Sequence, residues 1–88
     1  MIPDIEYGGW EWYFNEDLKT GYQWFEVNSR WFEFKANENL ELMWYNVKFN
    51  KWWFYDGDGS GANIKIKQLY KEFLNDKVDD ILLENTID

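Results

Sequence analysis

The sequence predicts an α+β fold: a four- to five-stranded antiparallel β-meander with a C-terminal α-helix packed on one face. Between residues 10 and 55, short aromatic runs of alternating pattern are separated by short polar turns, as in antiparallel hairpins. From residue 63 onward, apolar residues recur at the spacing of an amphipathic helix. We therefore expect a single domain over residues 1–88, strand-rich at 10–55, with an acidic glycine loop at 56–62 and a helix at 63–84.

The strands are expected in the aromatic part of the chain. Residues 1–9 are predicted to be an irregular lead-in, because Gly8-Gly9 is a turn or hinge signal. Strands should follow at residues 10–15, 22–27, 30–36, 40–49 and 52–55. The run 40–49 is the longest and is apolar on both faces, so we expect it to be central and covered on both sides.

The C-terminal helix is predicted from one apolar stripe. Asn63 is a candidate N-cap, and Asn75-Asp76 is a candidate break. Because a helix with a single apolar stripe is marginal on its own, we expect it to pack on one face of the sheet. The stripe comprises Ile66, Leu69, Tyr70, Phe73, Leu74, Val78, Ile81 and Leu82.

Packing alone must stabilise the core, because the chain has no cysteine and so no disulfide. Seven Trp, six Tyr and seven Phe supply large apolar groups, each able to bury roughly 150–250 Å². The absence of cysteine suits a reducing cytosol, so we expect a cytoplasmic protein. No signal peptide and no run of about 18 apolar residues is present, so no membrane association is expected.

The net charge of −8 argues against direct nucleic-acid binding and favours a basic protein partner. The acids are concentrated at the two ends of the chain, because residues 1–20 and 56–88 each carry −4 while residues 21–55 are neutral overall. The alternative interpretation is that this charge only keeps an aromatic-rich protein soluble.

The residue types needed for common catalytic chemistry are absent. Without histidine or cysteine, the chain lacks the usual general base, the thiol nucleophile and the usual transition-metal ligands. Ser29 and Ser60 are the only serines, and no base is present to build a triad around them. We therefore expect neither an enzyme nor a cofactor.

One loop matches part of a calcium site. Asp56, Asp58 and Ser60, with Gly61 after them, fit the first six positions of a calcium-binding helix–loop–helix site. The match ends at position 12, where Lys67 stands in place of the bidentate glutamate. The loop is therefore a weak Ca²⁺ candidate, and the alternative is a plain connection between sheet and helix.

A weak internal repeat gives part of the chain a resemblance to a known family. Trp10, Trp31 and Trp52 are 21 residues apart, and the segments 20–22 (TGY) and 53–60 (WFYDGDGS) sit around this repeat. Residues 20–61 resemble the choline- and glucan-binding cell-wall repeats of Gram-positive surface proteins. The resemblance implies aromatic cages for choline or a sugar. Ser29 or Asn50 stands where those repeats have a glycine, and the helix has no counterpart in them.

Two functions remain open from the sequence. The first is a small acidic interaction or inhibitor module, of phage anti-defence or bacterial immunity type, that occludes a basic, nucleic-acid-handling protein. Carboxylates would act as a nucleic-acid mimic and aromatic residues as anchors. The residues predicted to contact the partner are Trp10, Glu11, Trp12, Glu16, Asp17, Trp52, Trp53, Asp56, Asp58, Asp76, Asp79 and Asp80. The alternative is an aromatic carbohydrate- or choline-binding module, and an exposed aromatic face could also form a homodimer.

Overall fold

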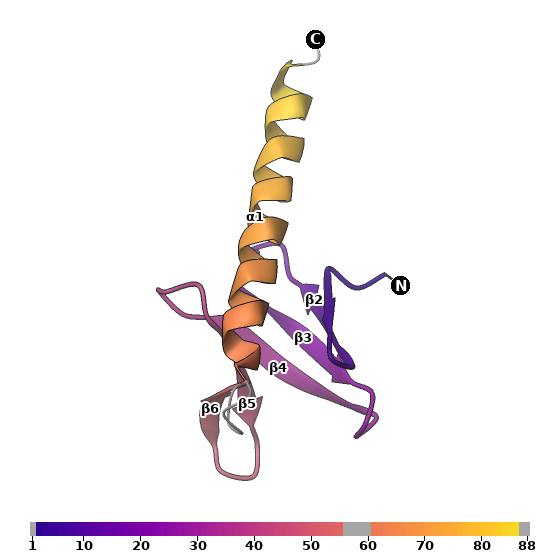
Figure 1. Ribbon diagram of the computed structural model, residues 1–88, viewed down its shortest axis with the longest axis vertical. Coiled ribbons are helices and arrows are strands. Elements are labelled where there is room, and N and C mark those ends of the chain that lie inside the picture. The colour runs from indigo at the N-terminus through magenta and orange to yellow at the C-terminus, as the bar shows by residue number, and fades with distance from the viewer. Residues whose placement is uncertain (1, 56–60, 87–88) are drawn as a thin grey trace.

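The computed structural model describes residues 2–55 and 61–86, with side chains described up to residue 79. Over these residues the chain forms six strands followed by one helix (Figure 1). The strands are β1 (Ile5–Tyr7), β2 (Trp10–Phe14), β3 (Thr20–Phe25), β4 (Arg30–Ala36), β5 (Leu42–Asn46) and β6 (Lys51–Phe54), and the helix is α1 (Ala62–Thr86). The predicted α+β arrangement of an antiparallel meander with one C-terminal helix is confirmed.

The described sheet has six strands, and the predicted four to five is wrong because a strand already forms before residue 10. Ile5 pairs with Trp12, so residues 5–7 are not an irregular lead-in. Gly8 and Gly9 both have positive φ, at 57° and 84°. This backbone is typical of a two-residue type I′ turn, whose twist matches that of a hairpin. The Gly-Gly pair therefore closes a hairpin.

The other four hairpins close with turns of one kind. In each, the backbone N–H of the fourth turn residue donates to the carbonyl of the first, and that fourth residue has a positive φ. These residues are Leu18, Ser29, Leu40 and Asn50, with φ between 50° and 61°. Two of the turns shorten β5 to five residues, so the prediction that it is the longest strand is wrong. β4, with seven residues, is longer.

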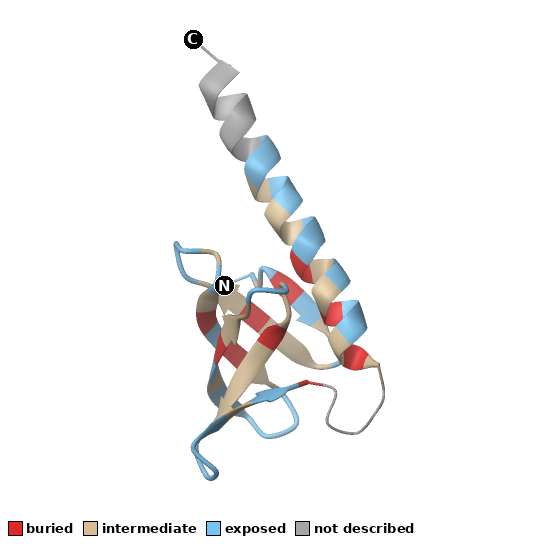
Figure 2. Ribbon diagram, turned by 90° about the vertical axis from the view of Figure 1, so that its left-hand side faces the viewer, coloured by how far each residue is buried: buried red, intermediate tan, exposed pale blue. Residues whose placement is uncertain are grey.

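The sheet has two faces of different composition. The inner face is the one on which α1 packs, and it includes Ile5, Trp12, Phe34, Leu42 and Tyr55. Together with Ala62, Ile66 and Tyr70 of α1, these side chains form the buried core. Figure 2 shows the buried residues on the strands and on the turns of the helix nearest the sheet. The outer face follows from the strand register and carries Glu11, Tyr13, Tyr22, Trp24, Trp31, Glu33, Lys35, Tyr45 and Trp52.

The helix runs without interruption from Ala62 to Thr86, so the predicted break at Asn75-Asp76 is wrong. The Gly61 carbonyl accepts hydrogen bonds from the backbone amides of Ile64 and Lys65, which places Gly61 at the start of the first turn.

Asn63 lies inside the helix and does not act as the predicted N-cap. Its side-chain amide donates to Glu41 Oε2 over 3.2 Å. The other carboxylate oxygen of Glu41 accepts from the Asn37 amide over 3.1 Å. These hydrogen bonds, of which the one from Asn37 has the largest effect, hold the pKa of Glu41 below its ordinary value. Glu41 therefore ties the base of α1 to the turn between β4 and β5.

The first half of α1 packs on the sheet. The Phe14 ring stacks on Tyr70 and Phe73, with centroid distances of 5.3 and 4.6 Å. The Tyr70 hydroxyl also donates to the Leu18 carbonyl over 2.5 Å, at the left-handed end of the β2–β3 turn. Figure 1 shows the rest of the helix projecting past the sheet. The radius of gyration, 14.1 Å, accordingly exceeds the roughly 12 Å of a compact chain of this length.

Membrane crossing by a helix requires both length and apolar character. No helix in the described part of the chain combines the two.

Gly21 is required because of a close approach and not because of its φ. A Cβ at this position would lie 2.1 Å from the Tyr13 carbonyl oxygen and 2.9 Å from the Phe34 ring. We therefore expect Gly21→Ala to lower the free energy of unfolding by about 3 kcal/mol, measured by urea denaturation.

Gly9→Ala is the matched control, because Gly9 has a φ of 84° but no atom within 4 Å of a Cβ placed there. Only the left-handed backbone is penalised in that variant, at about 1 kcal/mol. Equal losses in the two variants would contradict the packing described here.

Candidate functional site

A chain of two buried hydrogen bonds crosses the inner face. The Trp12 indole N–H donates to the Tyr55 hydroxyl oxygen over 3.1 Å. The Tyr55 hydroxyl in turn donates to Gln23 Oε1, also over 3.1 Å. Burial raises the pKa of Tyr55 above its ordinary value, so the hydroxyl keeps its proton. The chain therefore fixes one orientation for the Gln23 side-chain amide.

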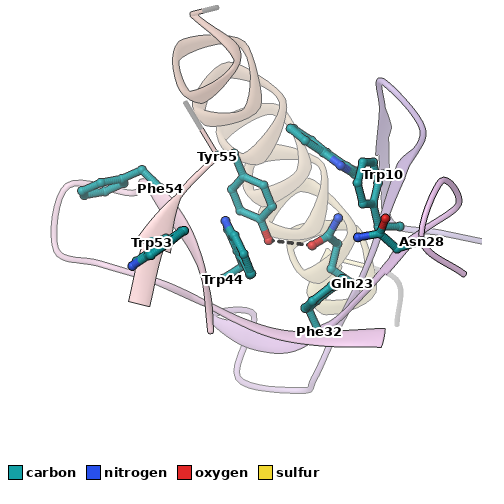
Figure 3. Close-up of a pocket in the computed structure, with 9 residues that line it drawn as sticks. Trp10, Gln23, Asn28, Phe32, Trp44, Trp53, Phe54 and Tyr55 are labelled. Carbon is teal, nitrogen blue, oxygen red and sulfur yellow. Dashed lines mark hydrogen bonds between the residues drawn. The ribbon is translucent and has the colours of Figure 1, made fainter. Parts of the chain in front are cut away.

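A pocket of about 410 Å³ opens beside this chain on the inner face. Figure 3 shows the side chains of Trp10, Trp44, Trp53 and Tyr55 around it, with Gln23 between Tyr55 and Asn28. Among the described residues, seven aromatic side chains and two side-chain amides line it, and none of these is charged. Such a site can stack on a flat apolar group and orient it through one or two hydrogen bonds.

The outer face carries a second aromatic group, which is partly exposed. Tyr22 is 51% exposed and Trp31 is 50% exposed. Trp31 packs against Trp24 and Tyr13, with ring centroids 5.2 and 5.5 Å apart. Because these rings are held by one another and still face solvent, they form a rigid, accessible surface.

The outer face also carries negative charge. The Tyr13 hydroxyl donates to a Glu11 carboxylate oxygen over 2.5 Å. This hydrogen bond, reinforced by the charges of Glu11, Glu6 and Asp4, raises the pKa of Tyr13 to about 12. Glu33 pairs directly with Tyr22 on the neighbouring strand. Aromatic rings beside carboxylates are suited to bind a cation.

One aromatic ring of the outer face already makes a cation–π contact within the chain. The Lys35 ammonium lies 4.3 Å from the centroid of the Trp52 ring. Trp52 is itself packed against Tyr45, with centroids 5.2 Å apart. The outer face thus shows, within the chain, the contact that a basic side chain of a partner would make.

The four predicted tryptophan anchors do not share a surface. Trp12 has no exposed surface, so it belongs to the core and cannot anchor a partner in this fold. Trp10 is half-buried and lines the inner pocket together with Trp53. Trp52, which is also half-buried, lies on the outer face.

The predicted carboxylates are spread over three elements. Glu11 lies on the outer face, and Glu16 is exposed in the turn between β2 and β3. Asp17 shares that turn, where its oxygens accept hydrogen bonds from the amides of Lys19 and Thr20 and from the Thr20 hydroxyl. Those bonds hold its pKa below the ordinary value. Asp76 and Asp79 are exposed on α1.

Some of the predicted site residues lie outside the described residues or have no described side chain. The calcium candidate formed by Asp56, Asp58 and Ser60 falls outside the described residues, and so do the predicted contacts of Asp56 and Asp58. The backbone of Asp80 is helical, but its side chain is not described. Among the residues that are described, no group of three or more acidic side chains could hold a metal ion.

Several residues of both surfaces are missing from the sequence-based set. On the outer face these are Tyr13, Tyr22, Trp24, Trp31 and Glu33, and in the inner pocket the main one is Gln23. Strand alternation already separates Trp31 and Glu33 from the core-facing Phe32 and could have indicated the outer face. No local signal distinguishes Gln23, because its role depends on a residue 32 positions away.

Comparisons of the chain with protein-family models, with curated proteins and with solved structures find no similar protein.

Removing the Tyr55 hydroxyl tests the buried chain. Tyr55→Phe leaves the Trp12 indole N–H and Gln23 Oε1 without their partner. Each unpaired buried group costs about 1–3 kcal/mol, so we expect a loss of about 3 kcal/mol in the free energy of unfolding by urea denaturation. Gln23→Leu in the Tyr55→Phe background removes one unpaired group and should recover part of the loss.

Tyr22→Phe is the control, because Tyr22 is 51% exposed and its hydroxyl makes no hydrogen bond to a described residue. Its free energy of unfolding should change by less than about 0.5 kcal/mol. A Tyr55→Phe variant as stable as Tyr22→Phe would show that the hydrogen bonds do not hold the fold.

Proposed function

We propose that this protein is a small acidic interaction module whose outer sheet face binds a basic protein. The observation that carries the proposal is the partly exposed Trp31–Trp24–Tyr13 cluster, lying beside Glu11 and Glu33. Interfaces are often anchored by a few large aromatic side chains, and charge complementarity adds specificity and a faster association rate. The net charge of −8 agrees in sign with a basic partner.

The contact would combine two kinds of interaction. Arginine or lysine side chains of the partner would stack on Trp31 and Tyr22, as Lys35 does on Trp52. Glu11, Glu33 and Glu6 would pair with further basic side chains at the rim. If the partner holds a nucleic acid with the same basic residues, occupation of those residues inhibits it by competition.

An oligo-arginine peptide is a defined probe of this surface. We expect it to bind the full chain, and we expect Trp31→Ala to weaken binding roughly tenfold, which corresponds to about 1.4 kcal/mol. Calorimetric titration measures both affinities. Val27→Ala is the matched control, because Val27 is 79% exposed but lies in the β3–β4 turn and not on the outer face.

Salt distinguishes this function from the carbohydrate or choline alternative. Raising the salt from about 0.1 to about 1 M shortens the Debye length from about 10 to about 3 Å and should weaken peptide binding steeply. Glu33→Gln should reduce that salt dependence. Sugar stacking scarcely responds to salt, so tight binding of a methyl glycoside with no binding of the peptide would overturn the proposal.

A further inference from the structure

We propose that the inner-face pocket binds a neutral, planar heteroaromatic small molecule that presents a hydrogen-bond acceptor to Gln23. This pocket lies on the opposite side of the sheet from the outer face, so the inference is independent of the protein-binding function proposed above. Its volume, about 410 Å³, falls within the roughly 300–1,000 Å³ of small-molecule sites.

Gln23 is the group that makes this pocket selective. Its side chain is only 2% exposed, and it lines the pocket. Because Oε1 accepts the Tyr55 hydroxyl proton, the amide nitrogen must point the other way, as Figure 3 shows. That nitrogen donates no hydrogen bond to any of the described residues. A ligand acceptor placed against it completes the hydrogen bonding of a nearly buried group.

The described lining favours a neutral ligand. Every lining residue that the structure describes is aromatic or carries a side-chain amide, so none of these residues can pair with an anion. A cation can stack on the rings, but the N–H groups of Gln23 repel it. A neutral ligand with an acceptor for those N–H groups therefore fits the described lining better than an ion.

The lining also disfavours a sugar. Sugar hydroxyls donate as well as accept, and a buried hydroxyl needs an acceptor for its proton. The two innermost oxygens each already accept one hydrogen bond, because Gln23 Oε1 takes the Tyr55 proton and the Tyr55 oxygen takes the Trp12 indole proton. The several hydroxyl protons of a sugar would compete for what acceptor capacity remains on these oxygens and on the Asn28 side-chain amide. A planar heteroaromatic ring with a single N–H places fewer protons and offers an acceptor to the Gln23 nitrogen.

The walls suit a flat ring. Trp10 and Tyr55 lie 5.1 Å apart and tilted by 52°, and Trp44 and Trp53 meet edge to face at 5.7 Å. These are the distances at which aromatic rings attract one another. A further flat ring can therefore join either pair by stacking or edge contact.

A pair of bicyclic probes tests the inference. 2-Quinolone is neutral and planar and has a carbonyl acceptor, whereas indole is similar in size and shape but has none. Each carries one ring N–H, so the two probes differ in the acceptor and not in the donor. Titrated into the full chain, 2-quinolone should shift the NMR signals of the Gln23 side-chain amide and of the Trp10 and Trp53 indole N–H groups. The NMR signal of the Trp31 indole N–H on the outer face should not shift. We expect indole to bind roughly tenfold more weakly than 2-quinolone.

Three variants separate the contributions. Gln23→Met keeps the side-chain length but removes the amide N–H, so it should weaken 2-quinolone roughly tenfold and leave indole unchanged. Trp53→Ala removes a wall residue that is 38% exposed at the rim of the pocket. It should therefore weaken the binding of both probes while leaving the buried core intact. Trp31→Ala should change neither probe, although it weakens the oligo-arginine peptide.

The outcomes that overturn the inference are specific. Equal binding of 2-quinolone to the folded parent chain and to folded Gln23→Met would remove Gln23 from recognition. If Gln23→Met does not fold, unchanged 2-quinolone binding to Trp53→Ala would place the probe elsewhere. Absence of binding by both bicycles, or tighter binding of methyl glucoside or tetramethylammonium, would reject a neutral planar ligand.

Discussion

The buried chain from Trp12 through Tyr55 to Gln23 is the contact on which the rest of this structure depends. It joins residues 43 and 32 positions apart, whereas a meander otherwise pairs only neighbouring strands. Through these hydrogen bonds Tyr55, which follows the last strand, is held against β2 and β3, and its ring lines one side of the inner pocket. Ala62, the first residue of α1, belongs to the same buried core.

The surplus of aromatic residues is explained by the two faces. On the inner face, rings such as Trp12 and Phe34 are buried in the core under the helix. On the outer face, Tyr22 and Trp31 stay half exposed among carboxylates. The two surfaces therefore differ in chemistry: the outer one combines rings with negative charge, whereas the inner pocket combines rings with an uncharged amide donor.

Alternation and turn chemistry predicted most of the sheet, and the apolar stripe predicted the helix. β1 was hidden because three residues give no measurable period, although Gly8-Gly9 was a hairpin signal. The length of β5 was overestimated because a leucine such as Leu40 rarely adopts a positive φ and gives no turn signal. The repeated spacing of Trp10 and Trp31 reflects the spacing of the hairpins, because these two residues lie on opposite faces of the sheet. Which face the helix covers, and hence which tryptophan is buried, depends on long-range packing that no local pattern encodes.

Hydrogen exchange of the tryptophan indole N–H groups tests the central contact most directly. Trp12 has no exposed surface and its indole N–H is hydrogen-bonded to Tyr55, so NMR should find it the slowest to exchange of the seven indoles. Exchange of the Trp12 indole N–H as fast as that of the half-exposed Trp31 would contradict the account.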